Sequence, residues 1–249
     1  MSSPLPPPRL QDELACFFWS GETIRSRSVS DTILSGNLAV PTPPAPLIAD
    51  WEREIAQQLQ LEAGEVEPLS LPRARMRWPD YKHCVQAVAD WTRSLGLQEL
   101  LSTADVALMA CRGANYHHDG DQYGGMAFCN LFLSEDKGLD IHFPAAGRRI
   151  PIRRGTVVMF DTGQPHAVIE RGSSGFDAAS FGPGRDCSHV FLSWELPIED
   201  TQIAHALGIR FDTDPGAAAL LEEGRLCRHG APATVCAASG RWSTHRQIP

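Results

Sequence analysis

The feature that most constrains the fold is a series of short, strand-like apolar runs between residues 105 and 195. These runs occupy 105–111, 126–133, 139–143, 149–152, 156–161, 166–170 and 188–195. Turn signals that contain glycine lie between them, for example at 136–138 and 154–155. A doubly wound α/β fold would place helices between its strands, so this pattern favours an antiparallel sandwich or barrel.

Helical periodicity appears only outside this series. Residues 48–61 and 81–101 carry apolar side chains at three- and four-residue spacing, which predicts two helices covering one face of the strand region. We therefore expect a mainly β single domain with flanking helices. Its expected parts are a flexible proline-rich start (1–10), a segment with the supporting helices (11–103), the β core (104–200) and a C-terminal extension (201–249) with helices at 201–208 and 217–226.

Composition excludes several classes of protein. The formal net charge of -8 makes a nucleic-acid partner improbable, because such binding depends on clustered Lys and Arg. The N-terminus has no secretory signal pattern, and no apolar run approaches the ~18 residues that would span a membrane. The seven cysteines form no CxxC pair, which predicts reduced thiols in a cytoplasmic protein rather than a structural zinc site.

The residues best suited to chemistry are His117, Asp119 and His166. In an extended segment residues i and i+2 point the same way, so His117 and Asp119 can converge while His118 faces away. His166 follows a strand and a turn, which would place it at the edge of the next strand. Two imidazoles and one carboxylate form the ligand set that suits Fe(II) and leaves positions open for O₂. An HxD pattern alone is common, and these three residues could also be incidental.

Further landmarks follow the HxD tract in order. They are NLFLSE (130–135), KGLDIHFP (137–144), IPIRRGTVVMF (150–160), HAV (166–168) and FLSW (191–194). On these motifs the stretch 104–195 resembles the 2-oxoglutarate/Fe(II)-dependent oxygenase superfamily, in particular its prolyl-hydroxylase-like branch. The resemblance implies a double-stranded β-helix (jelly-roll) core and Fe(II) held by His117, Asp119 and His166. It also implies 2-oxoglutarate as cosubstrate, and hydroxylation of a C–H bond by O₂ with release of succinate and CO₂.

One part of the pattern does not match. The branch usually carries Arg or Lys at the start of its last core strand to bind the distal carboxylate of 2-oxoglutarate, and the aligned position here falls near Ser188 or His189. Arg185 is our first candidate for this role, because a guanidinium can grip a carboxylate with two hydrogen bonds. Arg171 is the second. Asn130 and Tyr116 are further candidates for contact with the cosubstrate.

Two other functions stay open. A cupin-like metalloenzyme would share the barrel and the histidines without using 2-oxoglutarate, and a non-catalytic β-barrel could bind a small molecule or a partner protein. The sequence does not identify the substrate, which could be an amino acid, a peptidyl side chain or a small metabolite. It does not identify the oligomeric state either.

Overall fold

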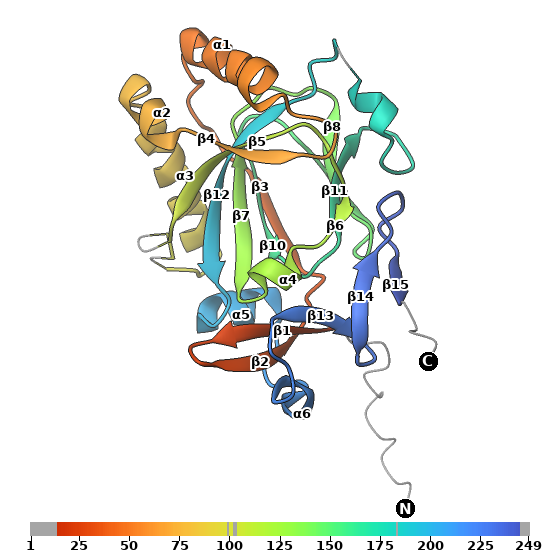
Figure 1. Cartoon of the computed structure of the whole chain (residues 1–249). Coiled ribbons are helices and arrows are strands. Elements are labelled where there is room, and N and C mark those ends of the chain that lie inside the picture. The colour runs from red at the N-terminus through yellow and green to blue at the C-terminus, as the bar shows by residue number, and fades with distance from the viewer. Residues whose placement is uncertain (1–13, 99, 102–103, 183, 245–249) are drawn as a thin grey trace, which may run out of the picture.

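The fold consists mostly of antiparallel β-sheets with a few helices on the outside (Figure 1). The computed structural model describes residues 14–98, 100–101, 104–182 and 184–244. The proline-rich start predicted for 1–10 lies outside the described residues. Among the described helices, none combines the length and the apolar composition needed to cross a membrane.

The strands and helices have the following bounds. The strands are β1 (Leu14–Ser20), β2 (Thr23–Ser28), β3 (Ile33–Asn37), β4 (Val66–Leu69), β5 (Val106–Cys111), β6 (Ala114–His117), β7 (Met126–Phe132), β8 (Leu139–Phe143), β9 (Arg148–Pro151), β10 (Thr156–Asp161), β11 (His166–Glu170), β12 (His189–Pro197), β13 (Arg225–Arg228), β14 (Ala231–Val235) and β15 (Trp242–Thr244). The helices are α1 (Ala45–Glu54), the π-helical turn η1 (Ile55–Leu59), α2 (Leu71–Arg77), α3 (Tyr81–Ser94), α4 (Gly120–Tyr123), the 3₁₀ turn η2 (Ala178–Phe181), α5 (Thr201–Leu207) and α6 (Pro215–Ala218).

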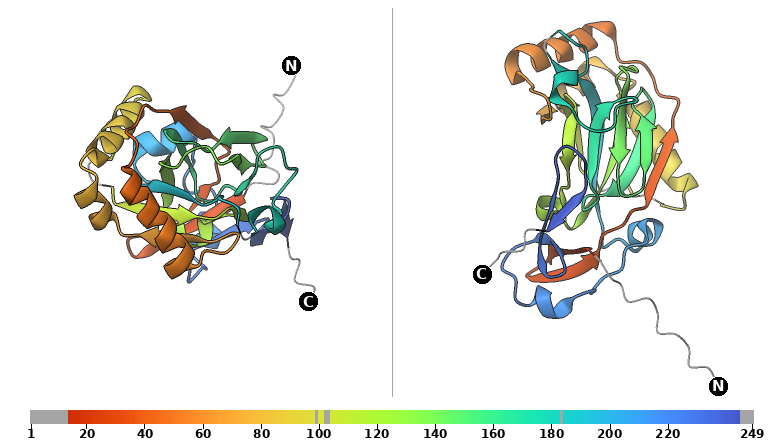
Figure 2. Two further views of the ribbon diagram at one scale, coloured as in Figure 1. Left: turned by 90° about the horizontal axis from the view of Figure 1, so that it is seen from above. Right: turned by 90° about the vertical axis from the view of Figure 1, so that its right-hand side faces the viewer.

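Strands β5 to β12 are divided between two sheets that face each other (Figure 2). The six-stranded sheet has the order β3-β10-β7-β12-β5-β4, and the four-stranded sheet has the order β6-β11-β8-β9. Between β5 and β12 the chain therefore crosses repeatedly from one sheet to the other, and of the sequential strands in this range only β8 and β9 pair. Each of the seven strand-like runs in the sequence corresponds to one of these strands.

Side-chain alternation gives each sheet two different faces. On β7, Phe128, Asn130 and Phe132 point between the two sheets, because the alternating residues Cys129 and Leu131 pack toward the helices. The space between the sheets is largely aromatic and aliphatic. Its buried members include Phe132, Phe143, Phe160 and Phe191.

Helices α1, α2, α3 and α5 contribute to the hydrophobic cluster on the outer face of the larger sheet. Helix α3 buries Tyr81, Cys84 and Val88 at three- and four-residue spacing, and these pack in one cluster with Trp194 of β12. The helix predicted for 81–101 ends at Ser94, because Gly96 adopts a left-handed conformation (φ +83°) just beyond it. The helix predicted for 48–61 corresponds to α1 and η1.

A third sheet joins the two ends of the described chain. Its order is β15-β14-β13-β1-β2, so the N-terminal hairpin pairs with the C-terminal extension below the main sheets in Figure 1.

The helix predicted from the sequence at 217–226 was wrong. The helix α6 ends at Ala218, and β13 pairs with β1 so that Leu226 and Cys227 become buried. The helix predicted at 201–208 is present as α5.

Candidate metal centre

The four-stranded sheet brings His117, Asp119 and His166 together. His117 is the last residue of β6, and it lies directly opposite His166, the first residue of β11. Asp119 follows at the N-cap of α4. One ligand atom from each of the three side chains lies within 4.8 Å of the other two, so the cluster could hold a metal ion.

Both imidazoles are fixed by the same kind of hydrogen bond. The Nδ1 of His117 donates to the carbonyl of Asn115 at 2.7 Å, and the Nδ1 of His166 donates to the carbonyl of Gln164 at 3.0 Å. A carbonyl oxygen can only accept, so Nδ1 carries a proton in each ring, which leaves Nε2 as the ring atom that can ligate a metal. Such bonds orient metal-ligating histidines.

The two free ring nitrogens face the carboxylate of Asp119. The Nε2 of His117 lies 3.7 Å from Oδ1, and the Nε2 of His166 lies 3.6 Å from Oδ2. Burial, and then the neighbouring His117, lowers the pKa of His166 to about 4, which keeps the ring neutral and able to ligate. Two imidazoles and one carboxylate on one side of a point are the ligand set that suits Fe(II).

The turn between β10 and β11 holds Asp119 in place. The backbone N–H of Asp119 donates to the carbonyl of Thr162 at 2.8 Å. The hydroxyl of Thr162 in turn contacts the carbonyls of Tyr123 and Met126, at 2.8 and 2.9 Å. The ligand-bearing segments are therefore connected to each other as well as to their own strands.

A buried ion pair anchors the same turn to the N-terminal hairpin. Arg27 on β2 donates through Nη1 and Nη2 to the two oxygens of Asp161, each at 2.8 Å, and both side chains are fully buried. Asp161 also accepts from the backbone N–H groups of Ser30 and Gly163, at 2.7 and 2.8 Å. Local sequence pattern does not indicate this pair, because its two members lie far apart in the chain and neither belongs to a motif.

Two of the residues expected to contact a cosubstrate lie on different faces. Asn130 points between the sheets, is 8% exposed, and its Oδ1 is buried without a partner, so its expected role stays a prediction. Tyr116 precedes His117 on β6 and faces the opposite way. Its hydroxyl contacts His142, and its ring packs with Ala167 and Ile169 on the outer face of the smaller sheet. The structure therefore does not bring Tyr116 to the cluster.

The two arginines expected to bind a carboxylate lie at the other end of β11. Arg185 pairs with Glu170, the last residue of that strand, at 2.9 Å, and its side chain is 48% exposed. Arg171 pairs with Asp136 and Asp140 at 3.0 and 2.9 Å. The structure therefore places both guanidiniums away from the cluster, and both are paired with acidic neighbours.

His189 is the side chain that the sequence reasoning did not choose. It is the first residue of β12, it lies on the same face as Phe191 between the sheets, and it is fully buried. Neither ring nitrogen has a partner in the described chain. Burial, and then the nearby Lys137, lowers the pKa of His189 to about 3. The alternation of side chains along β12 could have identified His189, because residues 189 and 191 share the inward face of the strand whereas Ser188 does not.

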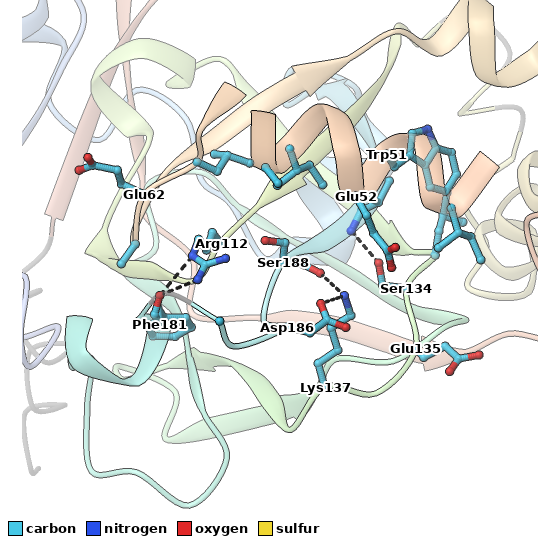
Figure 3. Close-up of a pocket in the computed structure, with 18 of the residues that line it drawn as sticks. Trp51, Glu52, Glu62, Arg112, Ser134, Glu135, Lys137, Phe181, Asp186 and Ser188 are labelled. Carbon is cyan, nitrogen blue, oxygen red and sulfur yellow. Dashed lines mark hydrogen bonds and ion pairs between the residues drawn. The ribbon is translucent and has the colours of Figure 1, made fainter. Parts of the chain in front are cut away.

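A separate cavity of about 1060 Å³ lies between α1 with η1 and the loops that follow β7 and η2 (Figure 3). None of the three cluster residues lines it. Its cations are engaged, since Lys137 contacts Asp186 and the carbonyl of Ser188, and Arg112 donates to the carbonyls of Phe181 and Gly182. This cavity is therefore distinct from the candidate metal centre.

No family model and no curated protein matches this sequence. Among solved structures, the chain is similar to the collagen prolyl hydroxylase of Paramecium bursaria Chlorella virus-1 in complex with 2-oxoglutarate, at 10% identity over 66% of this chain and 94% of that chain (TM-score 0.38). It is also similar to the epimerase SnoN in complex with Fe³⁺, α-ketoglutarate and nogalamycin RO, at 16% identity over 84% and 94% (TM-score 0.33). A third is apo HygX of Streptomyces hygroscopicus, at 11% identity over 68% and 82% (TM-score 0.30). With TM-scores below 0.5, these likenesses do not by themselves assign an activity to the chain.

Proposed function

We propose that this protein is a 2-oxoglutarate- and Fe(II)-dependent oxygenase that hydroxylates a C–H bond of an amino acid, a peptidyl side chain or a small metabolite. One observation carries the proposal. Two imidazoles, each donating Nδ1–H to a backbone carbonyl, direct their free Nε2 atoms toward one carboxylate at the ends of two paired strands.

The strand order supports a double-stranded β-helix as the scaffold. The four-strand sets β10-β7-β12-β5 and β6-β11-β8-β9 face each other, and the chain alternates between them as in a jelly roll. In this arrangement the end of β6 and the start of β11 meet at one end of the barrel, and His117 and His166 occupy these positions. Ligands on strand ends are held more rigidly than ligands on free loops.

Fe(II) bound by His117, Asp119 and His166 would supply the activation of O₂, with 2-oxoglutarate as the source of two electrons. The chain's own part is to fix coordination and to exclude water. The carbonyls of Asn115 and Gln164 orient the two rings, and the bond from Asp119 to Thr162 fixes the carboxylate-bearing backbone. Phe160 packs 4.8 Å from His166, ring centre to ring centre, and shields the buried side of the cluster.

For the distal carboxylate of the cosubstrate we propose His189 in place of Arg185. His189 lies on the inner face of β12 with both ring nitrogens unpartnered, and an unsatisfied buried polar group is costly unless a ligand completes its hydrogen bonds. A neutral imidazole can donate one hydrogen bond to a carboxylate. Asn130, also inward-facing and unpartnered at Oδ1, is proposed as a second polar contact.

Anaerobic titration tests the proposal directly. Wild-type protein should bind one equivalent of Fe(II), and added 2-oxoglutarate should produce a visible metal-to-ligand charge-transfer band. His166→Ala should lose both signals, whereas His83→Ala, which removes an exposed histidine on α3, should keep them. Absence of iron binding by the wild-type protein would refute the proposal.

The lack of an inward-facing Lys or Arg at the described start of β12 favours one rival, a cupin-like metalloenzyme that uses O₂ without 2-oxoglutarate. Succinate measurements separate the two enzymes. Succinate formed from 2-oxoglutarate during turnover supports the oxygenase proposed here, and iron binding without succinate under any substrate supports the rival.

A further inference from the structure

An aromatic wall connects the candidate metal centre to the outside. Phe160 contacts His166, Phe128 lies 6.1 Å from Phe160, and Tyr123 lies 5.1 Å from Phe128, all measured between ring centres. Phe128 and Tyr123 are only partly buried, unlike Phe160. The wall therefore leads from the buried imidazole to a solvent-accessible surface beside the cluster.

One carboxylate projects from the same face. Glu195 on β12 lies directly opposite Phe128 on β7, and directly opposed residues of antiparallel strands point to the same side of the sheet. Glu195 shares this face with Phe191, whereas its neighbours Trp194 and Leu196 pack toward the helices. Its side chain is exposed, and within the described chain it forms no hydrogen bond or ion pair.

The charges that act at this place are acidic. Burial raises the pKa of the Tyr123 hydroxyl, and the nearby carboxylates of Glu195 and then Asp119 raise it further. No Lys or Arg of the described chain contributes to that shift. Asp105, also exposed, immediately precedes β5, whose first residue pairs with Trp194, so it adds a second carboxylate at this end of the sheet.

Aromatic faces combined with an unpaired carboxylate are complementary to a cation. A ring face attracts an ammonium group through its quadrupole, and a carboxylate adds charge attraction that is strongest where solvent is partly excluded. An anionic substrate would meet repulsion from Glu195. A neutral one would gain no charge attraction from the carboxylate.

We propose that Tyr123, Phe128 and Glu195 bind a positively charged, amine- or ammonium-type group of the substrate beside the metal centre. This inference rests on the proposed function, because it identifies the substrate class of the same site. It gives Glu195 the role of selecting the cation and gives the two rings the role of holding its apolar part beside the candidate metal centre.

Probe binding tests the inference without a known substrate. Benzyltrimethylammonium is suitable because its nitrogen has no lone pair and cannot ligate a metal. We expect it to bind Mn(II)-loaded protein, measured by calorimetry, at least tenfold more tightly than benzyl alcohol or benzenesulfonate. Glu195→Gln should weaken this binding about tenfold, which corresponds to the loss of one such ionic contact. Equal affinity for the three probes, or unchanged affinity in Glu195→Gln, would overturn the inference.

Matched variants test the contributions of the aromatic ring and of the carboxylate separately. Tyr123→Phe should retain cation binding and Tyr123→Leu should weaken it, because the ring face rather than the hydroxyl is needed. Glu67→Gln removes an exposed carboxylate from β4 and should change nothing. Mn(II) stoichiometry is measured on the same samples. Normal Mn(II) binding without cation selectivity refutes the inference alone, whereas failure of the wild-type protein to bind Mn(II) refutes the proposed function.

Discussion

The two ends of the β11 strand handle polar groups in opposite ways. At its start, His166 meets His117 and Asp119, and the charged and polar groups that act on His166 are these two, the carbonyl of Gln164 and His118. At its end, Glu170 pairs with Arg185 on the surface, and the next residue, Arg171, pairs with Asp136 and Asp140. Among the described residues that act on His166 none is a cation, whereas Glu170, Arg171 and Arg185 at the other end are all paired with groups of opposite charge.

This difference distinguishes a site from a surface. Ion pairs that satisfy each other have no remaining demand for a partner and contribute little when exposed. Side chains held with free lone pairs directed at one point are costly to maintain unless a ligand completes them. Mutations at the two ends of β11 test this difference.

The largest effect should follow removal of the carboxylate from the cluster. Asp119→Ala should lower Fe(II) affinity by more than about a hundredfold, beyond the range seen when only a supporting hydrogen bond is lost. Glu170→Gln removes a carboxylate from the other end of β11 and should leave the affinity for Fe(II) unchanged. Iron content after gel filtration measures both. Iron retained at full stoichiometry in Asp119→Ala would show that the two ends do not differ in the way proposed.

The next effect concerns the buried ion pair behind the cluster. Arg27→Met should destabilise the fold by about 3–5 kcal/mol, because the Asp161 carboxylate would be left buried without its cation. Arg25→Met removes an exposed partner of Glu199 and Asp212 and should cost less than about 1 kcal/mol. Urea unfolding midpoints compare the two. The metal affinity of folded Arg27→Met should also fall, since Asp161 supports the turn that carries His166.

Local pattern was enough to predict seven of the core strands and to select the three cluster residues. Each of these seven strands is a short apolar run between turn signals, whereas β3, β4 and β6 were not among the predicted runs. The i, i+2 spacing of His117 and Asp119 is a property of extended backbone itself. The same alternation could have shown that Tyr116 faces away from His117. It could also have shown that His189 rather than Ser188 faces inward.

Other features could not be read from local pattern. The strand β13 forms because β1 offers a pairing edge from the opposite end of the chain, and this edge overrides the helical composition of 217–226. The pairs Arg27–Asp161 and Arg185–Glu170 depend on which distant charges the fold brings together. Tertiary context decides such contacts, so a guanidinium placed near a motif in sequence could not be assigned to a ligand.

A smaller effect is expected from pH. The pKa of His189 is lowered from 6.5 to about 3 by burial and then by Lys137, so the unfolded chain binds a proton more readily than the folded one. Stability should therefore be complete above pH 6.5 and should fall as pH decreases toward 3. At pH 5 this single group accounts for a loss of about 2 kcal/mol. The stability of His189→Phe, measured by urea midpoints, should change less between pH 7.5 and 5 than the stability of the wild-type protein. An equal change in the two proteins would contradict the assignment.

The smallest effect should come from the arginine that the sequence favoured. Arg185→Ala breaks a half-exposed pair with Glu170 and should cost less than about 1 kcal/mol of stability. It should leave the affinity for 2-oxoglutarate unchanged, whereas His189→Phe should weaken that affinity while iron binding persists. Titration of the charge-transfer band in the two variants measures this directly. A strong loss in Arg185→Ala with none in His189→Phe would mean that the surface arginine leaves Glu170 to bind the cosubstrate, and the contrast between the two ends of β11 would no longer hold.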